Sequence, residues 1–320
     1  MNIKEKFGTK VKELREKKGF SIELLANISN VDRTYISDIE KGKRNVSIEI
    51  MEKIILAFAI AFCSLNGLHA QETTSTTPFV IGETRTIVSK VLNEKRVLNI
   101  YLPNGFDQSK SYSVVYLPDG SANEDFLHIT GLVQFFNMQL QMPDFIVVGI
   151  ANVDRKRDFT FPTTNKKDKE QFPTTGASEK FITFLETELQ PYVESNFKTT
   201  GTKYLIGQSL GGLLATEILI KKPNLFTHYF IISPSLWWDD ESLLTLAASH
   251  LQQHDYSKTY VYVSVGTEGK VMENDAKSLA DILKKTKMKL DFLPLPLENH
   301  ATILHESMYQ AFKIQFPYKK

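Results

Sequence analysis

The sequence predicts an α/β protein with a mostly parallel sheet, preceded by a small all-α domain. Its 320 residues suggest two domains. Residues 1–53 contain no strong β-run and read as short helices, whereas β-rich and helical runs alternate from about Phe79 onward. The net charge of +1 averages a basic first part and a slightly acidic remainder, so it does not exclude nucleic acid as a partner. A single cysteine excludes an internal disulfide and metal sites built on several cysteines.

The first domain, residues 1–58, contains closely spaced signals for helix starts and stops. Ser21 is expected to cap one helix and Asp32 to cap the next, Arg33–Glu40, with a turn at 29–31 between them. Gly42 then supplies a left-handed helix end. The apolar residues expected inside are Val11, Leu14, Phe20, Leu24, Leu25, Ala26, Ile28, Ile36 and Ile39. From Phe7 to Phe58 this pattern resembles the Cro/repressor-type (XRE family) helix-turn-helix domain.

The resemblance implies DNA binding, because the second helix of the motif places its first residues in the major groove. The expected contacts to base edges are Arg33, Thr34 and Tyr35, and the expected contacts to phosphate are Lys41, Lys43 and Arg44. Ile22 departs from the family pattern, which commonly has a DNA-contacting glutamine at that place. A three-helix fold with a solvated basic face is the alternative. Such domains normally bind as dimers, and the sequence shows no separate dimerisation segment.

An apolar run, residues 54–65, overlaps the end of the first domain. A helix needs about 20 apolar residues to span a bilayer, and this run is shorter, but it fits the apolar region of a signal peptide. Residues 51–53 would be the charged start and residues 68–70 the cleavage site, so that the mature protein would begin at Gln71. Residues 54–70 as a whole are therefore expected to be a signal peptide or an anchor.

Two interpretations compete with a cleaved signal peptide. In an unprocessed chain, residues 54–65 would anchor the protein, with the basic first domain on the cytoplasmic side of the membrane. Alternatively, residues 47–60 are the last helix of the first domain, with Ser47 as its N-cap. In each case the polar residues 71–78 are expected to link to the second domain, residues 79–320.

The strongest catalytic signal is the pattern G-x-S-x-G at residues 207–211, with Ser209 at its centre. It follows a short apolar strand, 203–206, and precedes an apolar helix, 212–220. In this setting the glycines allow a tight turn that exposes the serine hydroxyl as a nucleophile. A glycine-rich turn with no catalytic role is the alternative.

A serine nucleophile needs a base, and the expected chain order in this setting is serine, acid, histidine. His300 lies in a loop after the last expected strand, 289–293, and is the predicted base. Glu268 lies directly after the strand 259–265 and is the predicted acid. The alternatives are His305 for the base and Asp275 or Glu273 for the acid, besides a Ser–His pair without an acid.

The tetrahedral intermediate of acyl transfer needs two backbone N–H donors, which form an oxyanion hole. Leu210, directly after the nucleophile, is expected to supply one. The other is expected from the loop after the strand 112–117, where Ser121 is the first choice and Gly120 the second. The alternative for this loop is an ordinary Asp-Gly turn.

From about residue 79 to 320 the chain resembles the putative esterase (esterase D) family of α/β-hydrolases, which includes siderophore and feruloyl esterases. The matching pieces include VVYLPDG, LIGQSLGGLLATEILIKKPNLF, ISPSLWW and ENHATILHESM. The resemblance implies an α/β-hydrolase fold with about eight strands. The candidate substrate-binding residues, in loops at the carboxyl edge of the sheet, are Trp237, Trp238, Arg155 and Arg157. Packing of the tryptophans and an internal pairing of arginine with Asp158 are the structural alternatives.

Together these features predict a serine esterase that hydrolyses a carboxylic ester of the siderophore or feruloyl type. The alternative is a sequence-specific DNA-binding transcriptional regulator whose hydrolase domain is sensory or vestigial. A third hypothesis is a fused or mis-started gene whose enzyme is exported to the periplasm or secreted from Met51 onward, while the first domain belongs in the cytoplasm. No phosphate-binding loop, dinucleotide fingerprint or metal-ligand spacing is present, so the sequence implies no cofactor and no metal.

Overall fold

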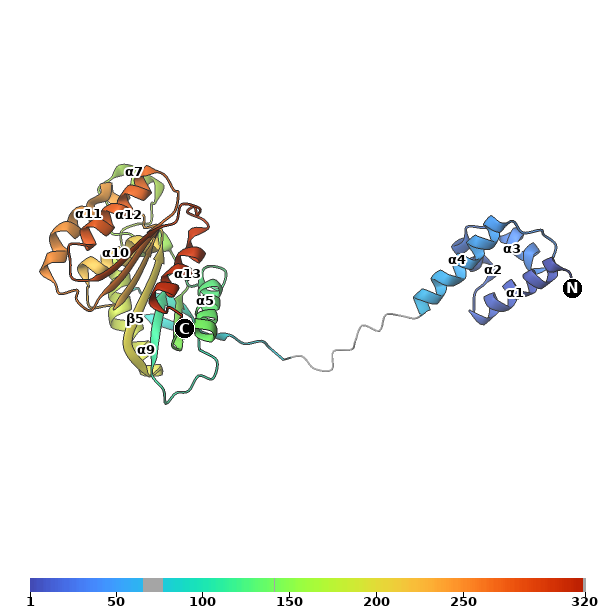
Figure 1. Ribbon diagram of the computed structural model, residues 1–320, viewed down its shortest axis with the longest axis horizontal. Helices are drawn as coiled ribbons and strands as arrows, with labels where there is room; N and C mark the ends of the chain where they lie inside the picture. The colour runs from blue at the N-terminus through green and yellow to red at the C-terminus, as the bar shows by residue number, and fades with distance from the viewer. Residues whose placement is uncertain (66–76, 141, 319–320) are drawn as a thin grey trace. The chain divides into compact units, whose positions relative to one another are not determined.

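The computed structural model describes residues 1–65, 77–140 and 142–318. The chain divides into two compact units, residues 1–78 and residues 79–320, and each is described by itself (Figure 1). The described part of the first unit is helical. Its helices are α1 Ile3–Lys17, α2 Ile22–Ser29, α3 Arg33–Glu40 and α4 Ile48–Leu65.

Side-chain caps fix the turn between α2 and α3. Ser21 Oγ accepts a hydrogen bond from the Leu24 N–H at 3.0 Å, and Asp32 Oδ1 accepts one from the Thr34 N–H at 2.8 Å. These bonds satisfy N–H groups that have no partner inside a helix. α2 ends on Asn30 with φ 50°, a left-handed conformation that asparagine tolerates. The predicted caps and turn are therefore present.

The core of the first unit differs in part from the expected one. Its buried apolar residues are Val11, Leu25, Ala26, Val31, Ile36, Ile39, Ile54 and Ala57. The prediction was wrong for Leu14, Leu24 and Ile28, which are 39%, 42% and 37% exposed. On α2 the buried stripe runs through Leu25, Ala26 and Ser29, so Leu24 and Ile28 lie on the adjoining stripe. A two-turn helix has too few residues for periodicity to select between such stripes.

The apolar run lies within α4. Ser47 Oγ accepts a hydrogen bond from the Ile50 N–H at 3.3 Å, and Ile54 and Ala57 are buried in the unit's core. Among the described residues, no helix is long and apolar enough to cross a membrane. Residues 66–70 of the expected signal peptide, and residues 71–76 of the expected linker, lie outside the described residues.

The second unit is built on one eight-stranded sheet with the order β1-β2-β4-β3-β5-β6-β7-β8. Its strands are β1 Gly82–Ser89, β2 Glu94–Tyr101, β3 Tyr112–Leu117, β4 Phe145–Ile150, β5 Thr199–Gln208, β6 His228–Ile232, β7 Tyr260–Val265 and β8 Lys289–Pro294. β2 pairs antiparallel with β1 and with β4, and the pairs from β4 to β8 are parallel. The predicted α/β class and the mostly parallel sheet are confirmed.

Helices cover both faces of this sheet (Figure 1). The helical segments are α5 Phe126–Leu140, α6 Arg155–Phe159, α7 Lys166–Gln171, α8 Ser178–Phe184, π-helical η1 Leu185–Leu189, α9 Gln190–Asn196, α10 Leu210–Lys221, α11 Trp238–His250, 3-10 helix η2 Leu251–Gln253, α12 Lys270–Leu283 and α13 Ile303–Gln315. α8, α10, α11 and α12 pack on the face that carries Val114 and Tyr116, whereas α5 and α13 pack on the face that carries Val115 and Leu117. Central strands buried on both faces are typical of parallel sheets.

The topology brings the candidate enzyme residues to one edge of the sheet. The carboxyl ends of the parallel strands β3 to β8 lie at this edge, and enzymes of the α/β class place their sites there. The segments that follow these strands contain the residues predicted for catalysis, for the oxyanion hole and for substrate binding.

Candidate active site

Ser209 occupies a strained turn between β5 and α10. Its φ of 60° and ψ of −119° are unfavourable for a residue with a side chain, and such a conformation costs about 1–3 kcal/mol. Three backbone hydrogen bonds hold it: Ser209 N–H donates to the Ile232 carbonyl at 3.0 Å, and the Ser209 carbonyl accepts from the N–H groups of Leu213 at 2.9 Å and Ser235 at 3.0 Å. The neighbouring structure therefore fixes the geometry that a nucleophile elbow requires.

The glycines around Ser209 are required by close backbone contacts. A Cβ atom on Gly207 would lie 2.2 Å from the Gly211 carbonyl oxygen, and one on Gly212 would lie 2.9 Å from Pro234 Cα. Such distances are too short for any side chain. The first glycine thus lets β5 approach α10, and the last lets the loop after β6 rest on the first turn of α10.

His300 and Glu268 are joined directly. His300 Nδ1 lies 2.5 Å from Glu268 Oε2, and Glu268 Oε1 accepts hydrogen bonds from Ser233 Oγ at 2.5 Å and from the Gly266 N–H at 3.0 Å. Burial alone would raise the pKa of Glu268, but the hydrogen bonds from His300, Ser233 and Gly266 outweigh it and hold the pKa below its ordinary value. The carboxylate is therefore ionised at neutral pH, opposite the imidazole.

Hydrogen bonds also tie the loop that carries His300 to its neighbours. Gln208, the residue before Ser209, donates from Nε2 to the His300 carbonyl oxygen at 2.6 Å. Thr267 N–H, in the loop that carries Glu268, donates to the Glu298 carbonyl oxygen at 2.8 Å. The elbow and the loops that carry Glu268 and His300 are thus directly connected.

The alternative residues for acid and base have other partners. Glu273 Oε1 accepts from the N–H groups of Glu268 and Gly269, each at 3.0 Å, and so holds the start of α12. Asp275 is buried on α12, where burial and the nearby Glu241 raise its pKa to about 6. His305 lies on α13, with its ring centroid 4.8 Å from that of His128. None of these contacts reaches the carboxylate of Glu268 or the imidazole of His300.

Sequence reasoning missed two serines of the site, Ser233 and Ser235. They follow β6, and both are buried. Among the described residues Ser209 Oγ is hydrogen-bonded to Ser235 Oγ, at 3.2 Å, rather than to His300. Catalytic hydrogen bonds often form only once the substrate is bound. The one sequence signal for these serines was their position directly after a central parallel strand.

The loop after β3 changes the expectation for the oxyanion hole. Gly120 N–H donates to the Ile150 carbonyl oxygen at 3.0 Å, so the second choice, Gly120, is wrong because its hydrogen is already donated to the last residue of β4. Ser121 N–H donates to the exposed carboxylate of Glu124 at 3.1 Å. Leu210 opens α10, where N–H groups have no intrahelical partner.

Arg155 lies beside the elbow and is ordered by Asp119. Its Nε and Nη2 donate to the two carboxylate oxygens of Asp119 at 2.6 and 2.9 Å, and Nη2 also donates to the Gln208 carbonyl oxygen at 3.1 Å. Asn152 Nδ2 connects the same aspartate to Glu124, with distances of 2.8 and 3.0 Å. Arg155 thus links the loop after β4 to both the elbow and the loop after β3, which contains Asp119.

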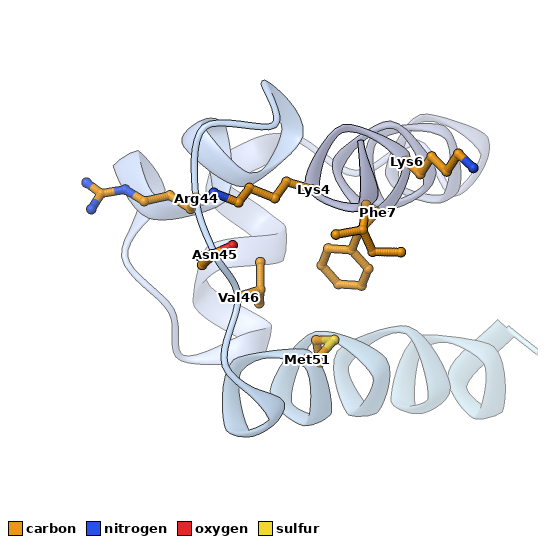
Figure 2. A pocket seen from close by; sticks show the side chains of 8 residues that line it. Lys4, Lys6, Phe7, Arg44, Asn45, Val46 and Met51 are labelled. Carbon is orange, nitrogen blue, oxygen red and sulfur yellow. The ribbon is translucent and has the colours of Figure 1, made fainter. Parts of the chain in front are cut away.

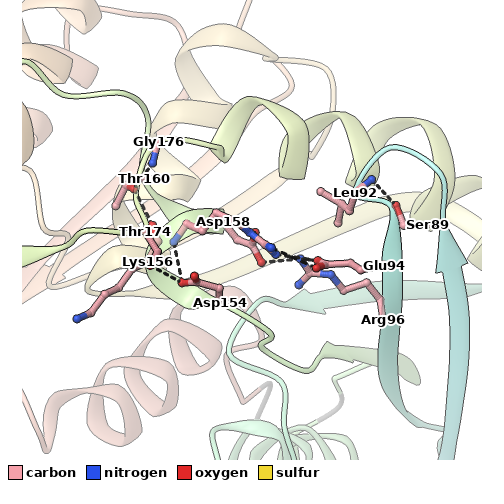
Figure 3. Close-up of polar contacts among 11 residues, drawn as sticks. Ser89, Leu92, Glu94, Arg96, Asp154, Lys156, Asp158, Thr160, Thr174 and Gly176 are labelled. Carbon is pink, nitrogen blue, oxygen red and sulfur yellow. Dashed lines mark hydrogen bonds and ion pairs between the residues drawn. The ribbon is translucent and has the colours of Figure 1, made fainter. Parts of the chain in front are cut away.

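Arg157 belongs to a different network. Its Nε lies 2.8 Å from Asp158 Oδ1 and its Nη2 lies 2.7 Å from Glu94 Oε1, while the fully buried Arg96 pairs with Asp158 at 2.6 Å and with Glu94. Figure 3 shows the side chains of Glu94, Arg96 and Asp158 directed toward one another. These contacts correspond to the structural alternative, an internal pairing with Asp158 that orders the loop after β4, and a contact between Arg157 and substrate stays a prediction.

The two tryptophans, Trp237 and Trp238, have different environments in the structure. Trp238 is fully buried and donates from Nε1 to the Phe161 carbonyl oxygen at 2.9 Å. The expectation that it binds substrate is wrong, because this indole is a core group with its only donor satisfied. Trp237 is half-buried, with its ring centroid 5.9 Å from that of Phe172, and remains a candidate for the pocket wall.

In the first unit, the residues predicted to contact DNA lie at and after the start of α3. Arg33, Thr34, Lys41, Lys43 and Arg44 are exposed and Tyr35 is half-buried. Arg44 Nε pairs with Asp38 at 3.2 Å, and its guanidinium lies 5.2 Å from the centre of the Tyr35 ring. Near them is a hollow of about 440 Å³, across which Phe7 and Met51 face each other (Figure 2).

The strand–turn–helix elbow on a mostly parallel sheet defines an α/β-hydrolase. Residues 89–300 match the family model described as putative esterase, and residues 11–64 match the one described as helix-turn-helix. The chain belongs to the putative esterase family, and it is an esterase that carries an N-terminal helix-turn-helix domain. Among the described residues, no group of three or more histidine, cysteine, aspartate or glutamate side chains is placed to hold a metal ion.

Three relatives illustrate these matches. The ferri-bacillibactin esterase BesA of Bacillus subtilis is 27% identical over 275 residues, which cover 73% of this chain and 90% of the relative. An IroE-like serine hydrolase from Shewanella oneidensis has a TM-score of 0.68 at 30% identity, covering 73% of this chain and 80% of that structure. The control protein C.MunI of a Mycoplasma species is 48% identical over 65 residues, which are 20% of this chain and 88% of the relative.

Proposed function

We propose that the protein is a serine carboxylic ester hydrolase that uses a triad of Ser209, His300 and Glu268. The observation that carries the proposal is the hydrogen bond between His300 Nδ1 and Glu268 Oε2, 2.5 Å long, together with the hydrogen bond that ties the His300 carbonyl to the residue before Ser209. Ser209 Oγ attacks the ester carbonyl while its proton passes to the free nitrogen of His300. Glu268 holds the imidazole by the other nitrogen and stabilises the positive charge that develops on it.

The second half of the reaction returns the enzyme to its starting state. His300 gives its proton to the departing alcohol, and an acyl group remains on Ser209. Water then attacks the acyl carbonyl, with its proton accepted by His300, and the carboxylic acid leaves as Ser209 regains its hydrogen.

The oxyanion formed in each half needs donors at the elbow. We assign them to the N–H groups of Leu210 and Ser121. Because Ser121 N–H donates to the exposed Glu124 carboxylate in this structure, Glu124 must turn away before the oxyanion binds. Arg155 supports this arrangement, since it holds Asp119 at the base of the same loop.

For the substrate, we propose an ester of the siderophore type, with a feruloyl ester as the competing class. Relatives named as ferri-bacillibactin esterase and siderophore enterobactin esterase support the first class. Trp237 and the exposed part of Arg155 are the groups available to contact an aromatic or anionic substrate. The protein is incubated with ferri-bacillibactin, enterobactin or methyl ferulate, and chromatography then shows which of these esters it has cleaved. The cleaved ester identifies the substrate class.

The triad is tested by Ser209→Ala. Hydrolysis of p-nitrophenyl butyrate is expected to disappear while the circular dichroism spectrum stays unchanged. Ser195→Ala, which alters an exposed serine on α9, is the matched control and is expected to keep full activity. Activity retained in the folded Ser209→Ala variant would sink the assignment.

A second function rests on the first unit. We propose that it binds duplex DNA, with Arg33, Thr34 and Tyr35 at base edges and Lys43 and Arg44 at phosphates. The exposure of these arginines and lysines, together with the 48% identity to a control protein, supports this proposal. Gel shifts with a duplex selected from a random library are expected to weaken about 5- to 150-fold for Arg33→Ala.

Salt dependence separates the two kinds of contact. Lys43→Ala is expected to weaken binding to all duplexes equally. It is also expected to reduce the magnitude of the slope of log affinity against log salt concentration by about one, as for one lost phosphate contact. If the full chain selects no sequence, and its binding does not depend on salt, the DNA-binding proposal fails.

A further inference from the structure

We propose that Ser233 and Ser235 are positioning residues of the esterase reaction, each acting on a different member of the triad. This proposal rests on the proposed function of Ser209, His300 and Glu268. The two serines flank Pro234 in the loop that follows β6, and they are 0% and 2% exposed. Neither belongs to the sequence pattern that revealed the nucleophile.

Ser235 holds the nucleophile at two points. Its N–H donates to the Ser209 carbonyl oxygen at 3.0 Å, and its Oγ lies 3.2 Å from Ser209 Oγ. When the Ser235 hydroxyl donates, the hydrogen of Ser209 stays free to pass to His300. As Ser209 Oγ gains negative charge during attack, a donated hydrogen bond becomes stronger. Ser235 therefore stabilises the transition state more than the resting enzyme.

Ser233 acts on the acid. Its hydroxyl donates to Glu268 Oε1 at 2.5 Å, which leaves Oε2 directed at His300 Nδ1. Ser233 has a φ of 42°, in the left-handed region that residues with side chains rarely adopt. Its N–H donates to the Ser264 carbonyl oxygen of β7 at 2.8 Å. A strained and fully buried serine whose hydroxyl bonds the acid is consistent with a positioning role.

The loop between these contacts has little room to shift. Pro234 Cα would lie 2.9 Å from a Cβ atom on Gly212, so the loop rests directly on the first turn of α10. The nucleophile and the acid come from segments about 60 residues apart in the chain, and residues 233–235 contact both. We infer that this short segment sets the position of Ser209 relative to the pair of Glu268 and His300.

The test of Ser235 compares two buried serines. Ser235→Ala and Ser178→Ala remove hydroxyls of equal burial, but no hydrogen-bond partner of Ser178 Oγ is found among the described residues. We expect Ser235→Ala to lower kcat for p-nitrophenyl butyrate about fivefold, as for one lost hydrogen bond, with KM unchanged. The rate of inactivation by diethyl p-nitrophenyl phosphate, which reports nucleophilic attack, is expected to fall equally. Ser178→Ala is expected to change neither quantity.

An unchanged inactivation rate in Ser235→Ala, or an equal loss in Ser178→Ala, would overturn the role of Ser235. Ser235→Cys keeps a side chain of similar size but has only a weak S–H donor, and it gives the same readout where the alanine variant does not fold. Failure of the triad itself would be seen separately, as activity retained in Ser209→Ala.

Ser233→Ala has a different signature. Without the Ser233 hydrogen bond, more negative charge is available at Glu268 Oε2 to stabilise the protonated imidazole. The acid limb of the profile of kcat/KM against pH is therefore expected to move to higher pH in Ser233→Ala and to stay in place in Ser235→Ala. A profile for Ser233→Ala that coincides with that of the unaltered protein would overturn its role.

Discussion

Replacement of Glu268 by glutamine measures what the buried carboxylate contributes to catalysis. Glu268→Gln keeps the size of the side chain and an oxygen that accepts from Ser233, but it removes the negative charge. The side chain is 2% exposed and touches His300 Nδ1, so the new amide meets the imidazole directly. Since an amide N–H cannot accept from Nδ1–H, the variant also favours the wrong tautomer of the histidine.

The size of the effect follows from the exposure of the two partners. Unit charges about 4 Å apart interact by about 4 kcal/mol at an effective dielectric constant of about 20. Because the His300 side chain is 47% exposed, water screens part of this interaction, and about 2–3 kcal/mol is the expected loss in the transition state. This corresponds to about 30- to 150-fold in kcat, with KM nearly unchanged.

Steady-state hydrolysis of p-nitrophenyl butyrate at neutral pH gives both constants. Glu273→Gln is the matched control, because it removes a charge from the first turn of α12, directly after the loop of Glu268, while keeping an acceptor for the N–H groups of Glu268 and Gly269. We expect it to lower kcat less than threefold. A loss below threefold for Glu268→Gln, or a larger loss for Glu273→Gln, would refute the reasoning.

The stability of the Glu268→Gln variant is expected to depend on pH. The folded pKa of Glu268 lies below its ordinary value, so its stabilising contribution is fully present above a pH of about 4.3 and is lost as the pH falls through the folded pKa. Glu268→Gln is therefore expected to be less stable than the unaltered protein at neutral pH, and the difference is expected to shrink in acid. Thermal denaturation across this range measures it, and a difference that grows in acid would contradict the sign.

Four further predictions concern other parts of the chain. Because burial raises the pKa of Asp275 to about 6, its ionisation above that pH disfavours folding; Asp275→Asn should raise Tm at alkaline pH and leave it unchanged below a pH of about 4, and a uniform shift would be evidence against this. Trp238→Phe is expected to lower the free energy of unfolding by about 1–3 kcal/mol with KM unchanged, whereas Trp237→Phe should change KM for an aromatic ester; the reverse pattern would exchange their roles. Gly120→Ala should fail to yield folded enzyme, because its Cβ would lie 2.2 Å from Ile150 N; normal activity would show that the contact relaxes. The signal-peptide hypothesis predicts that the protein purified from cells begins at Gln71, and an intact Met1 in the active protein would contradict it.

The sequence predicted those parts of the site that local pattern and chain order determine. G-x-S-x-G between an apolar strand and an apolar helix predicted Ser209 as the nucleophile, and the order serine, acid, histidine predicted Glu268 and His300 as its partners; His300 Nδ1 lies 2.5 Å from Glu268 Oε2 in the structure. The parallel sheet follows from the same alternation of strands and helices. Each of these inferences depends on residues that are close in sequence or on a fixed topology.

The contacts of Arg157 and Trp238 could not be predicted, because they join segments that are distant in sequence. Arg157 is paired with Glu94 across 63 positions, and the carbonyl that accepts from the indole of Trp238 belongs to Phe161. No local pattern identifies such partners. The serines at 233 and 235 were missed for the same reason, since their contacts to Glu268 and Ser209 exist only after three loops meet. Ser–Pro–Ser by itself resembles an ordinary turn.

The most direct test of the central claim is the site of covalent labelling by diethyl p-nitrophenyl phosphate. Peptide mass analysis of the inactivated full chain is expected to find one diethylphosphoryl group, on Ser209, at a rate that parallels the loss of esterase activity. Ser209→Ala is expected to remain unlabelled. A label on another residue, or loss of activity with Ser209 unmodified, would contradict the account.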